Sequence, residues 1–288
     1  MFAKLEIMKL SIITINRNNT EGLRKTMDSV FNQTFKDFEY IVIDGNSSDG
    51  SVELIEKFKN SSSIDGFLWF SEPDSGIYNA MNKGIGMAKG EYIQFLNSGD
   101  ILAGNNVTEK MLGSLPNNCD IFYGNMLKPL SKRIHRDRGF AGRIPTMLDF
   151  YTGTLNHSSA YIKRNLFDTY GLYDENLKIV SDWKWYLQVI ALNDIKPNYV
   201  DIDVTIFDMT GISTMNSSLD KEERMQVLSE ILPISVLKDY ESYSFPIEQV
   251  KRINRYCITR KGFWFVERIL FKIEELSNKR ASFTIKSR

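Results

Sequence analysis

Cysteine and histidine are scarce in this sequence, which contains two of each among 288 residues. Cys119 and Cys257 lie far apart and belong to no CxxC or Cys/His pattern, which excludes a disulfide framework and a zinc site of that kind. We therefore expect a protein of a reducing compartment. At 42% hydrophobic residues, the chain can bury one large core and carry a small extension.

Long apolar runs are also missing. No window approaches the roughly 18 uninterrupted apolar residues that a membrane-spanning helix needs. The N-terminus MFAKLEIMKLSIITI lacks the apolar region and small-residue cleavage site of a signal peptide. We expect a cytoplasmic protein, which can lie against the inner face of the cytoplasmic membrane without crossing it.

The sequence has no net charge, because 36 Lys and Arg residues balance 36 Asp and Glu residues. This balance gives no reason to expect nucleic acid as a partner. The distribution is uneven, however. From Lys251 to Arg288 there are 11 basic and 3 acidic residues, a difference of +8, which marks the tail as a candidate contact for an anionic surface.

Two common nucleotide-binding motifs are missing as well. Neither GxGxxG nor GxxxxGK[ST] follows the first predicted strand, which disfavours a dinucleotide enzyme and a P-loop ATPase. The glycine-rich stretch GIGMAKG, residues 84–90, lies at the end of a predicted helix. The helix dipole is unfavourable for phosphate at that end, so we do not expect a phosphate loop there.

The sequence does contain a regular alternation of short apolar strands and amphipathic helices in its first hundred residues. The predicted elements are a strand at 10–15, a helix at 20–33, a strand at 40–44, a helix from about 51, a strand at 67–71, a helix at 77–88 and a strand at 92–97. This pattern predicts an α/β fold with a mostly parallel central sheet and helices on both faces. Ligands then bind beyond the carboxyl ends of the strands.

The alternation is less regular after residue 100. We expect a helix near 108–115, a strand at 120–126, a mobile basic loop at KPLSKRIHRDRG, a strand at SSAYIKR, a helix at 181–192, a half-exposed strand at VDIDVTIFDM and helical structure from about 219 to near 279. We assign residues 1–218 to the main domain and residues 219–288 to a helical, basic C-terminal extension.

Three aspartates are the first candidates for chemistry. Asp44 and Asp100 each follow a predicted parallel strand, so their side chains should face one crevice. Asp182 precedes an aromatic-rich helix. A structural role is the alternative for all three, since such carboxylates form turns and cap helices, and Ser181 or Asp182 is well placed to cap the helix that follows.

Four segments together resemble the family 2 glycosyltransferases, which have the GT-A fold. They are LSIITINRN, EYIVIDGNSSDGS, SEPDSGIYNAMNKGIGMAKGEYIQFLNSGD and YDENLKIVSDWKWYLQV, spread over roughly residues 9–193. The third is the most specific, because it combines EPDSGIYNAMNKG with an acidic strand end about twenty residues later. The resemblance implies a nucleotide-sugar donor and a divalent metal, Mn²⁺ or Mg²⁺.

The resemblance also implies roles for individual residues. Asp182 would be the catalytic base, and Asp100 would contact the metal ion as the last acid of a DxD-type motif. The donor would lie against Thr14, Asn16, Asp44, Asp74 and Asn97.

His157 is a further candidate, as a phosphate, metal or acceptor contact. A structural or solvated histidine is the alternative. The arginines of the basic stretch, at 133, 136, 138 and 143, are candidates for a pyrophosphate contact, and a solvated loop face is the alternative.

The chemistry of sugar transfer agrees with these roles. A carboxylate within hydrogen-bond reach of the acceptor hydroxyl can take its proton, and a divalent ion neutralises the charge that develops on the departing diphosphate. One or two carboxylates suffice, since Mg²⁺ and Mn²⁺ also use phosphate and water oxygens.

The sequence departs from the family pattern in two places. Relatives commonly carry two or three acids where this chain reads Asn97, Ser98, Gly99, Asp100, and GNSS replaces a common second aspartate after Asp44. These changes indicate weaker metal binding at Asp100 and a less certain contact between Asp44 and the nucleotide base.

The sequence therefore predicts an inverting glycosyltransferase that uses a nucleotide sugar, specifically a UDP-sugar. The acceptor would be a hydroxyl of a glycan or a lipid-linked saccharide, as in bacterial relatives that build O-antigen or capsule units. A sugar nucleotidyltransferase and a non-catalytic nucleotide- or carbohydrate-binding module are the alternatives. The stretch RKGFWFVERILFKIEELSNKR, residues 260–280, is interpreted as a helix that either packs on the domain or lies on an anionic membrane.

Overall fold

The computed structural model describes residues 9–61, 63–211, 216–243, 261–262, 264–269 and 271–272. The chain consists of two compact units, Met1–Ile231 and Leu232–Arg288. Helix α9 (Ser217–Ile231) belongs to the first unit. The domain boundary predicted from sequence, after residue 218, lies at the start of this helix. This domain boundary stays a prediction.

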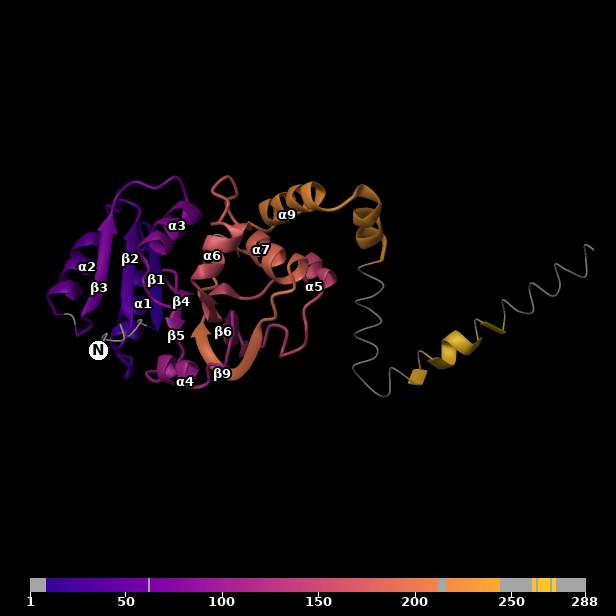
Figure 1. Ribbon diagram of the computed structural model, residues 1–288, viewed down its shortest axis with the longest axis horizontal. Coiled ribbons are helices and arrows are strands. Elements are labelled where there is room, and N and C mark those ends of the chain that lie inside the picture. Colours follow the sequence, from indigo (N-terminus) through magenta and orange to yellow (C-terminus); the bar gives the residue numbers. More distant parts are fainter. Residues whose placement is uncertain are drawn as a thin grey trace, which may run out of the picture. The chain divides into compact units, whose positions relative to one another are not determined.

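The first unit begins with the expected alternation of strands and helices (Figure 1). Its elements are β1 (Leu10–Asn16), α1 (Thr20–Phe31), β2 (Glu39–Asp44), α2 (Ser51–Asn60), β3 (Gly66–Ser71), α3 (Ile77–Met87) and β4 (Tyr92–Phe95). Every residue of β1 and β2 is buried, as expected for central strands covered on both faces. The α/β fold is confirmed.

The second half of this unit contributes the remaining strands and several short helices. They are β5 (Ile101–Leu102), α4 (Val107–Gly113), β6 (Ile121–Leu130), β7 (Arg133–Asp137), α5 (Met147–Thr152), η1 (His157–Ser159), β8 (Ala160–Lys163), α6 (Asn165–Tyr170), α7 (Ser181–Tyr186), η2 (Leu187–Leu192) and β9 (Asn198–Ile206). The helix expected over 181–192 forms as α7 followed directly by the π-helical segment η2.

All of these strands join one sheet in the order β3-β2-β1-β4-β8-β6-β9-β5, with β7 paired to β6. The pairs β3–β2, β2–β1 and β1–β4 are parallel, whereas β8 runs antiparallel to both β4 and β6. The parallel region therefore places the carboxyl ends of β1, β2 and β4 at one edge of the sheet. This edge is where the sequence predicts ligand binding.

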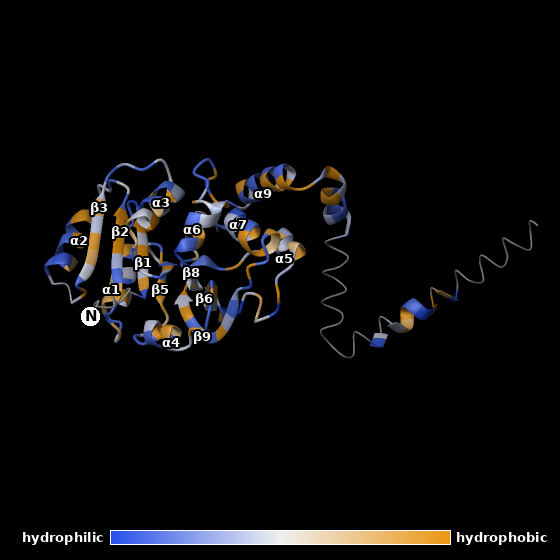
Figure 2. Cartoon of the chain, in the orientation of Figure 1, coloured by the Kyte–Doolittle hydropathy of each residue, from blue (hydrophilic) through white to orange (hydrophobic). Residues whose placement is uncertain are grey.

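Helices cover both faces of the sheet. Side chains of α1, α2 and α4 share one core cluster with alternate residues of β1, β2 and β4, such as Ile12 and Tyr40. Helix α3 packs on the opposite face, where Gly84 lies against Ile13. Figure 2 shows the corresponding pattern of hydropathy: β2 is largely orange, whereas α2 carries both orange and blue.

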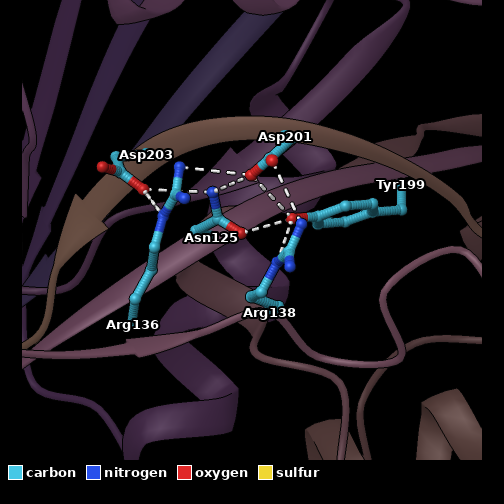
Figure 3. Close-up of polar contacts among 6 residues, drawn as sticks. All are labelled: Asn125, Arg136, Arg138, Tyr199, Asp201 and Asp203. Atoms are coloured by element: carbon cyan, nitrogen blue, oxygen red, sulfur yellow. Dashed lines mark hydrogen bonds and ion pairs between the residues drawn. The ribbon is translucent and has the colours of Figure 1, made fainter.

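The basic stretch predicted as a mobile loop is an ordered β-hairpin instead. Strands β6 and β7 pair antiparallel from Met126↔Asp137 to Leu130↔Arg133. Figure 3 shows how two of its arginines are held: Arg136 contacts Asp201 and Asp203, and Arg138 contacts Asp201 and Tyr199. Arg143, beyond the hairpin, pairs with Asp149.

The described arginines 136, 138 and 143 are thus engaged by carboxylates of the protein. Asn125 completes the network of Figure 3, because its amide donates to Asp201 and Asp203 and its carbonyl oxygen lies 2.7 Å from the Tyr199 hydroxyl. This network attaches the hairpin to β9.

In the second unit, residues 234–243 are helical, as are the described residues between 261 and 272. The rest of the tail segment 260–280 lies outside the described residues. None of the helices in the described part of the chain is long and apolar enough to cross a membrane.

Candidate active site

A cavity of about 620 Å³ lies beyond the carboxyl ends of β1 and β4. It brings together six of the residues predicted from sequence: Asn16, Asp74, Asn97, Asp100, His157 and Asp182. They come from separate segments of the chain, and the strand ends, η1 and α7 place them around one space. The cavity is also lined by residues that the sequence analysis did not select, among them Tyr78, Lys178, Asp208 and Arg224.

Asp182 is held by two side chains from distant parts of the sequence. The Tyr78 hydroxyl, on α3, lies 2.8 Å from its Oδ1, and Nδ1 of His157 lies 3.2 Å from its Oδ2. The capping role considered for Ser181 or Asp182 is not observed, since α7 has Val180 at its N-cap and no side-chain cap. The Asp182 carboxylate is directed to the cavity instead.

Asp182 and His157 shift each other's pKa in opposite directions. Burial by itself raises the pKa of Asp182, but the hydrogen bond and charge of His157, together with Tyr78, outweigh burial and lower it below its ordinary value. Burial by itself lowers the pKa of His157, and the hydrogen bond and charge of Asp182 outweigh it and raise the pKa above 6.5. The pair therefore favours a carboxylate beside an imidazolium.

On its other side, the His157 ring reaches the strand end that carries Asn97. Its Nε2 lies 3.3 Å from Nδ2 of Asn97. His157 thus links the end of β4 to Asp182 across the cavity, and its side chain is 20% exposed. Of the alternatives considered for this histidine, the structure shows a partly buried, hydrogen-bonded residue in direct contact with Asp182.

Asp100 lies in a tight turn that depends on glycine. Gly99 has φ +107°, and a Cβ at this position would come within 2.3 Å of Oδ2 of Asp208. The backbone N–H of Asp208 donates to Oδ1 of Asp100 over 2.8 Å. Asp100 and Asp208 therefore both lie at the cavity wall, and burial raises the pKa of Asp100 to about 7.

Three oxygen acceptors of the cavity residues are buried without a hydrogen-bond partner in the described structure. They are Oδ1 of Asn16, Oδ1 of Asn97 and Oδ2 of Asp100. Buried polar atoms are nearly always paired in folded proteins, so unpaired acceptors at one wall indicate a site for donors or for a cation. No described group of three or more His, Cys, Asp or Glu residues is arranged to hold a metal ion.

Asp74 is fixed in the loop between β3 and α3. Its Oδ1 accepts from the N–H of Gly76 and lies 3.6 Å from Arg17, and its side chain is 6% exposed. The absence of a side chain at Gly45 allows Asp74 to approach, because a Cβ there would come within 2.3 Å of the carboxylate. The carboxyl ends of β1, β2 and β3 are therefore packed closely together.

Thr14 and Asp44 do not line the cavity. Thr14 is fully buried, and its hydroxyl donates to the carbonyl of Leu96. Asp44 is also fully buried and accepts hydrogen bonds from Asn16, Ser47 and Ser71. Burial by itself raises the pKa of Asp44, and these hydrogen bonds outweigh burial and lower it. The structure places Asp44 behind Asn16, which it orients.

A family model described as glycosyl transferase family 2 matches residues 11–175. An uncharacterized glycosyltransferase of Mycobacterium tuberculosis is 32% identical over 212 residues, which cover 71% of this chain and 77% of the relative. A PGL/p-HBAD biosynthesis glycosyltransferase of Mycobacterium bovis is 25% identical over 216 residues, covering 74% of this chain and 81% of the relative.

Two solved structures share the fold. S. aureus TarS 1–349 in complex with UDP-GlcNAc superposes with a TM-score of 0.62 at 20% identity, covering 81% of this chain and 70% of TarS. The mannosyltransferase PcManGT from Pyrobaculum calidifontis, in complex with GDP-Man and Mn²⁺, gives a TM-score of 0.53 at 15% identity, covering 69% and 56%. With the GT-A fold and the family match in agreement, this chain is a transferase that belongs to glycosyl transferase family 2.

Proposed function

We propose that this glycosyltransferase moves one sugar, with inversion, from a UDP-sugar to a hydroxyl of a glycan or lipid-linked saccharide during cell-surface polysaccharide synthesis. The cavity at the strand ends supports a nucleotide-sugar donor. The UDP-GlcNAc complex of TarS, which has the same fold, supports UDP as the nucleotide. The M. bovis relative is named as a glycosyltransferase of PGL/p-HBAD biosynthesis, which supports a biosynthetic role.

The observation that carries this proposal is the setting of Asp182. Its carboxylate borders the cavity, is oriented by Tyr78 and His157, and has a lowered pKa. As general base it accepts the proton of the acceptor hydroxyl. The hydroxyl oxygen then forms the new bond to the anomeric carbon while the bond from that carbon to the diphosphate breaks, and UDP leaves from the opposite face of the sugar.

His157 supports Asp182 in this step. As an imidazolium it stabilises the carboxylate before the proton arrives, and its ring lies between Asp182 and Asn97, on the wall that would hold the diphosphate. The donor itself would lie along Asn16, Asp74 and Asn97, where Asn16 and Asn97 each present an unpaired oxygen. Thr14 and Asp44 would act from behind this wall, by fixing the strand end and the Asn16 amide.

The residues present fit the divalent metal that this family uses. Asp100 carries a buried, unpaired Oδ2, and the carboxylate of Asp208, which also lines the cavity, lies against Gly99 in the same turn. Both are oxygen ligands of the kind that Mg²⁺ and Mn²⁺ prefer, and two carboxylates are enough when phosphates and water complete the coordination. When bound, the ion neutralises the charge that develops on the leaving diphosphate.

The test of this function is the release of UDP from a panel of UDP-sugars, with calorimetric titration of UDP, GDP and CMP in the presence and absence of Mn²⁺. Asp182→Asn is expected to lower turnover by about 10²- to 10⁴-fold, the usual contribution of a general base, and to leave the Kd for UDP within a factor of about two. Asp168→Asn, an exposed aspartate on α6, is the matched control and should behave like the native protein.

Other results would point to other functions. Full turnover by Asp182→Asn would refute the base assignment. Release of pyrophosphate instead of UDP would identify a sugar nucleotidyltransferase. Nucleotide binding without any release of product would identify a binding module.

We further infer that the tail contacts an anionic membrane, where a lipid-linked acceptor would reside. In the described part of the tail, Phe265 and Phe271 are 66% and 69% exposed, and Lys and Arg are the predominant charged residues from position 251 onward. Exposed aromatic groups beside cations suit the headgroup region of a membrane.

The test is co-sedimentation of the full chain with vesicles of anionic or zwitterionic phospholipid. Phe265→Ser combined with Phe271→Ser should weaken binding to the anionic vesicles. Phe70→Ser, which changes an exposed phenylalanine on β3, should not. Equal binding by all three proteins would refute the inference.

A further inference from the structure

Helix α9 carries a buried carboxylate whose hydrogen-bond donors, among the described residues, are all backbone groups. Glu223 is 7% exposed, and its Oε1 accepts from the N–H of Lys178 over 2.7 Å. Its Oε2 accepts from the N–H groups of Ile179, at 3.0 Å, and Val180, at 3.3 Å. None of the ion pairs in the described part of the chain includes Glu223, and its carboxylate is held by three successive backbone N–H groups.

These three residues lead directly into α7, whose second residue is Asp182. Figure 1 shows α9 alongside α7. Residues 178–180 have no regular helical or strand structure of their own that would fix their backbone. Their N–H groups are therefore oriented by Glu223, because buried amides need partners and a carboxylate supplies strong ones.

The same segment is held from its other side by Tyr78. The Tyr78 hydroxyl lies 2.5 Å from the carbonyl oxygen of Ile179 and 2.8 Å from Oδ1 of Asp182. Tyr78 thus contacts both the backbone of Ile179 and the carboxylate of Asp182, and couples their positions. A shift of the Ile179 peptide would move the hydroxyl that orients Asp182.

Neighbours of Glu223 on α9 face the cavity. Asp220 and Arg224 both line it, and the guanidinium of Arg224 lies 4.6 Å above the ring of Trp183, the residue after Asp182. The matched family region ends at residue 175, so neither Asp182 nor α9 lies within it. This attachment of the helix to the Asp182 segment is a feature of the chain beyond the matched region.

We propose that Glu223 is a positioning residue for the transfer reaction: it fixes the backbone of residues 178–180 and so sets the direction from which Asp182 meets the acceptor hydroxyl. The proposal rests on the proposed role of Asp182 as base. A displacement of about 1 Å at a reacting group lowers rates by about 10²-fold, which is the size of effect that loss of this attachment predicts.

The experiment compares Glu223→Gln, Asp182→Asn and the double variant in the full chain. Glutamine keeps the length of the side chain, but its NH₂ group cannot accept from the backbone N–H groups that it would face. Glu223→Gln should lower kcat by about 10- to 100-fold while the Kd for UDP stays within a factor of about two. Glu222→Gln, an exposed neighbour on α9, is the matched control and should leave kcat unchanged.

The double variant separates positioning from a general structural role. If Glu223 acts through Asp182, adding Glu223→Gln to Asp182→Asn should cause no further loss of the residual rate. A further loss of the same factor in the double variant would overturn the proposal, as would an unchanged kcat in Glu223→Gln. Should Glu223→Gln fail to bind UDP, Glu223→Asp is measured in the same way. Failure of both to bind UDP would assign Glu223 to folding alone and would also overturn the proposal.

These results are distinct from failure of the proposed function. Full turnover by Asp182→Asn alone would refute the base role of Asp182, whatever Glu223→Gln does. Loss of turnover in Asp182→Asn together with native behaviour of Glu223→Gln would refute only the positioning role.

Discussion

At the scale of single residues, the site depends on pairs of side chains that change each other's ionisation. The lowered pKa of Asp182 makes it stabilise the fold above its unfolded pKa of about 3.8, and this stability is lost as pH falls through the folded pKa. The raised pKa of His157 makes it stabilise the fold below 6.5, and this is lost as pH rises through its folded pKa. The ion pair is therefore intact between the folded pKa of Asp182 and the folded pKa of His157.

Removal of the histidine charge should change the pH profile of the reaction. In His157→Asn, burial of Asp182 is no longer offset by the imidazolium, so the pKa of the carboxylate rises. The acidic limb of kcat, measured between pH 4.5 and 8, should then move toward higher pH. His135→Asn, which changes an exposed histidine on β7, should keep the native profile. An unshifted limb in His157→Asn would contradict the coupling.

The turn before Asp100 allows a second prediction. Gly99→Ala introduces a Cβ at φ +107° and against the carboxylate of Asp208. We expect it to weaken Mn²⁺-dependent UDP binding in calorimetry and to lower the free energy of unfolding by about 1–3 kcal/mol. Gly113→Ala, at an open position at the end of α4, serves as control. Native metal-dependent binding by Gly99→Ala would show that this turn does not hold the metal.

The site could be predicted from sequence only where its residues lie in local patterns. Asp100 follows a strand, and Asp182 precedes an aromatic helix, so both were selected, and the structure brings them to one cavity. Tyr78 and Glu223 carry no local signal, because their roles depend on contacts 104 and 43 to 45 residues away in sequence. Asp208 lies inside the expected strand VDIDVTIFDM, whereas β9 ends at Ile206, so the sequence pattern did not reveal its position beyond a strand end.

At the scale of elements, the contact between α3 and β1 positions the wall that carries Tyr78. Gly84 allows the helix to approach the sheet, since a Cβ there would lie 2.6 Å from Cγ2 of the fully buried Ile13. Gly86, on the same helix, faces open space. Close packing therefore requires glycine at position 84, whereas position 86 has room for a side chain.

Alanine substitutions should distinguish them. Gly84→Ala is expected to lower the free energy of unfolding by about 1–3 kcal/mol, the usual cost of overpacking a core, despite the better helix propensity of alanine. Gly86→Ala should raise it by up to about 1 kcal/mol. Chemical denaturation measures both. Equal effects would show that α3 does not pack as described.

The elements up to β4 were predicted with small differences in their ends, because parallel strands covered on both faces appear in sequence as apolar runs. The β6–β7 hairpin was missed. Its residues from Pro129 to Arg136 are exposed, so they show no apolar alternation. The pairing with Asp201 and Asp203 that holds it comes from β9, more than sixty residues later.

At the scale of the whole molecule, the two compact units divide after Ile231, so α9 is part of the unit that contains the cavity. A chain shortened after residue 231 should keep UDP binding and cooperative unfolding. A chain shortened after residue 218 should lose turnover, because it lacks Glu223 and the Asp220–Arg224 pair. Equal turnover of the two shortened chains, measured as UDP release, would place the functional boundary at 218.

The attachment of the Asp182 segment to α9 also has a consequence for biosynthesis. The residues that would receive the donor, from Asn16 to Asp100, leave the ribosome more than a hundred residues before Glu223 does. Since translation adds about 5–20 residues per second, these residues are synthesised several seconds before the glutamate that would fix the Asp182 segment. During that interval the growing polypeptide lacks Glu223, so the attachment of the Asp182 segment would be among the last contacts of this unit to form, when α9 emerges.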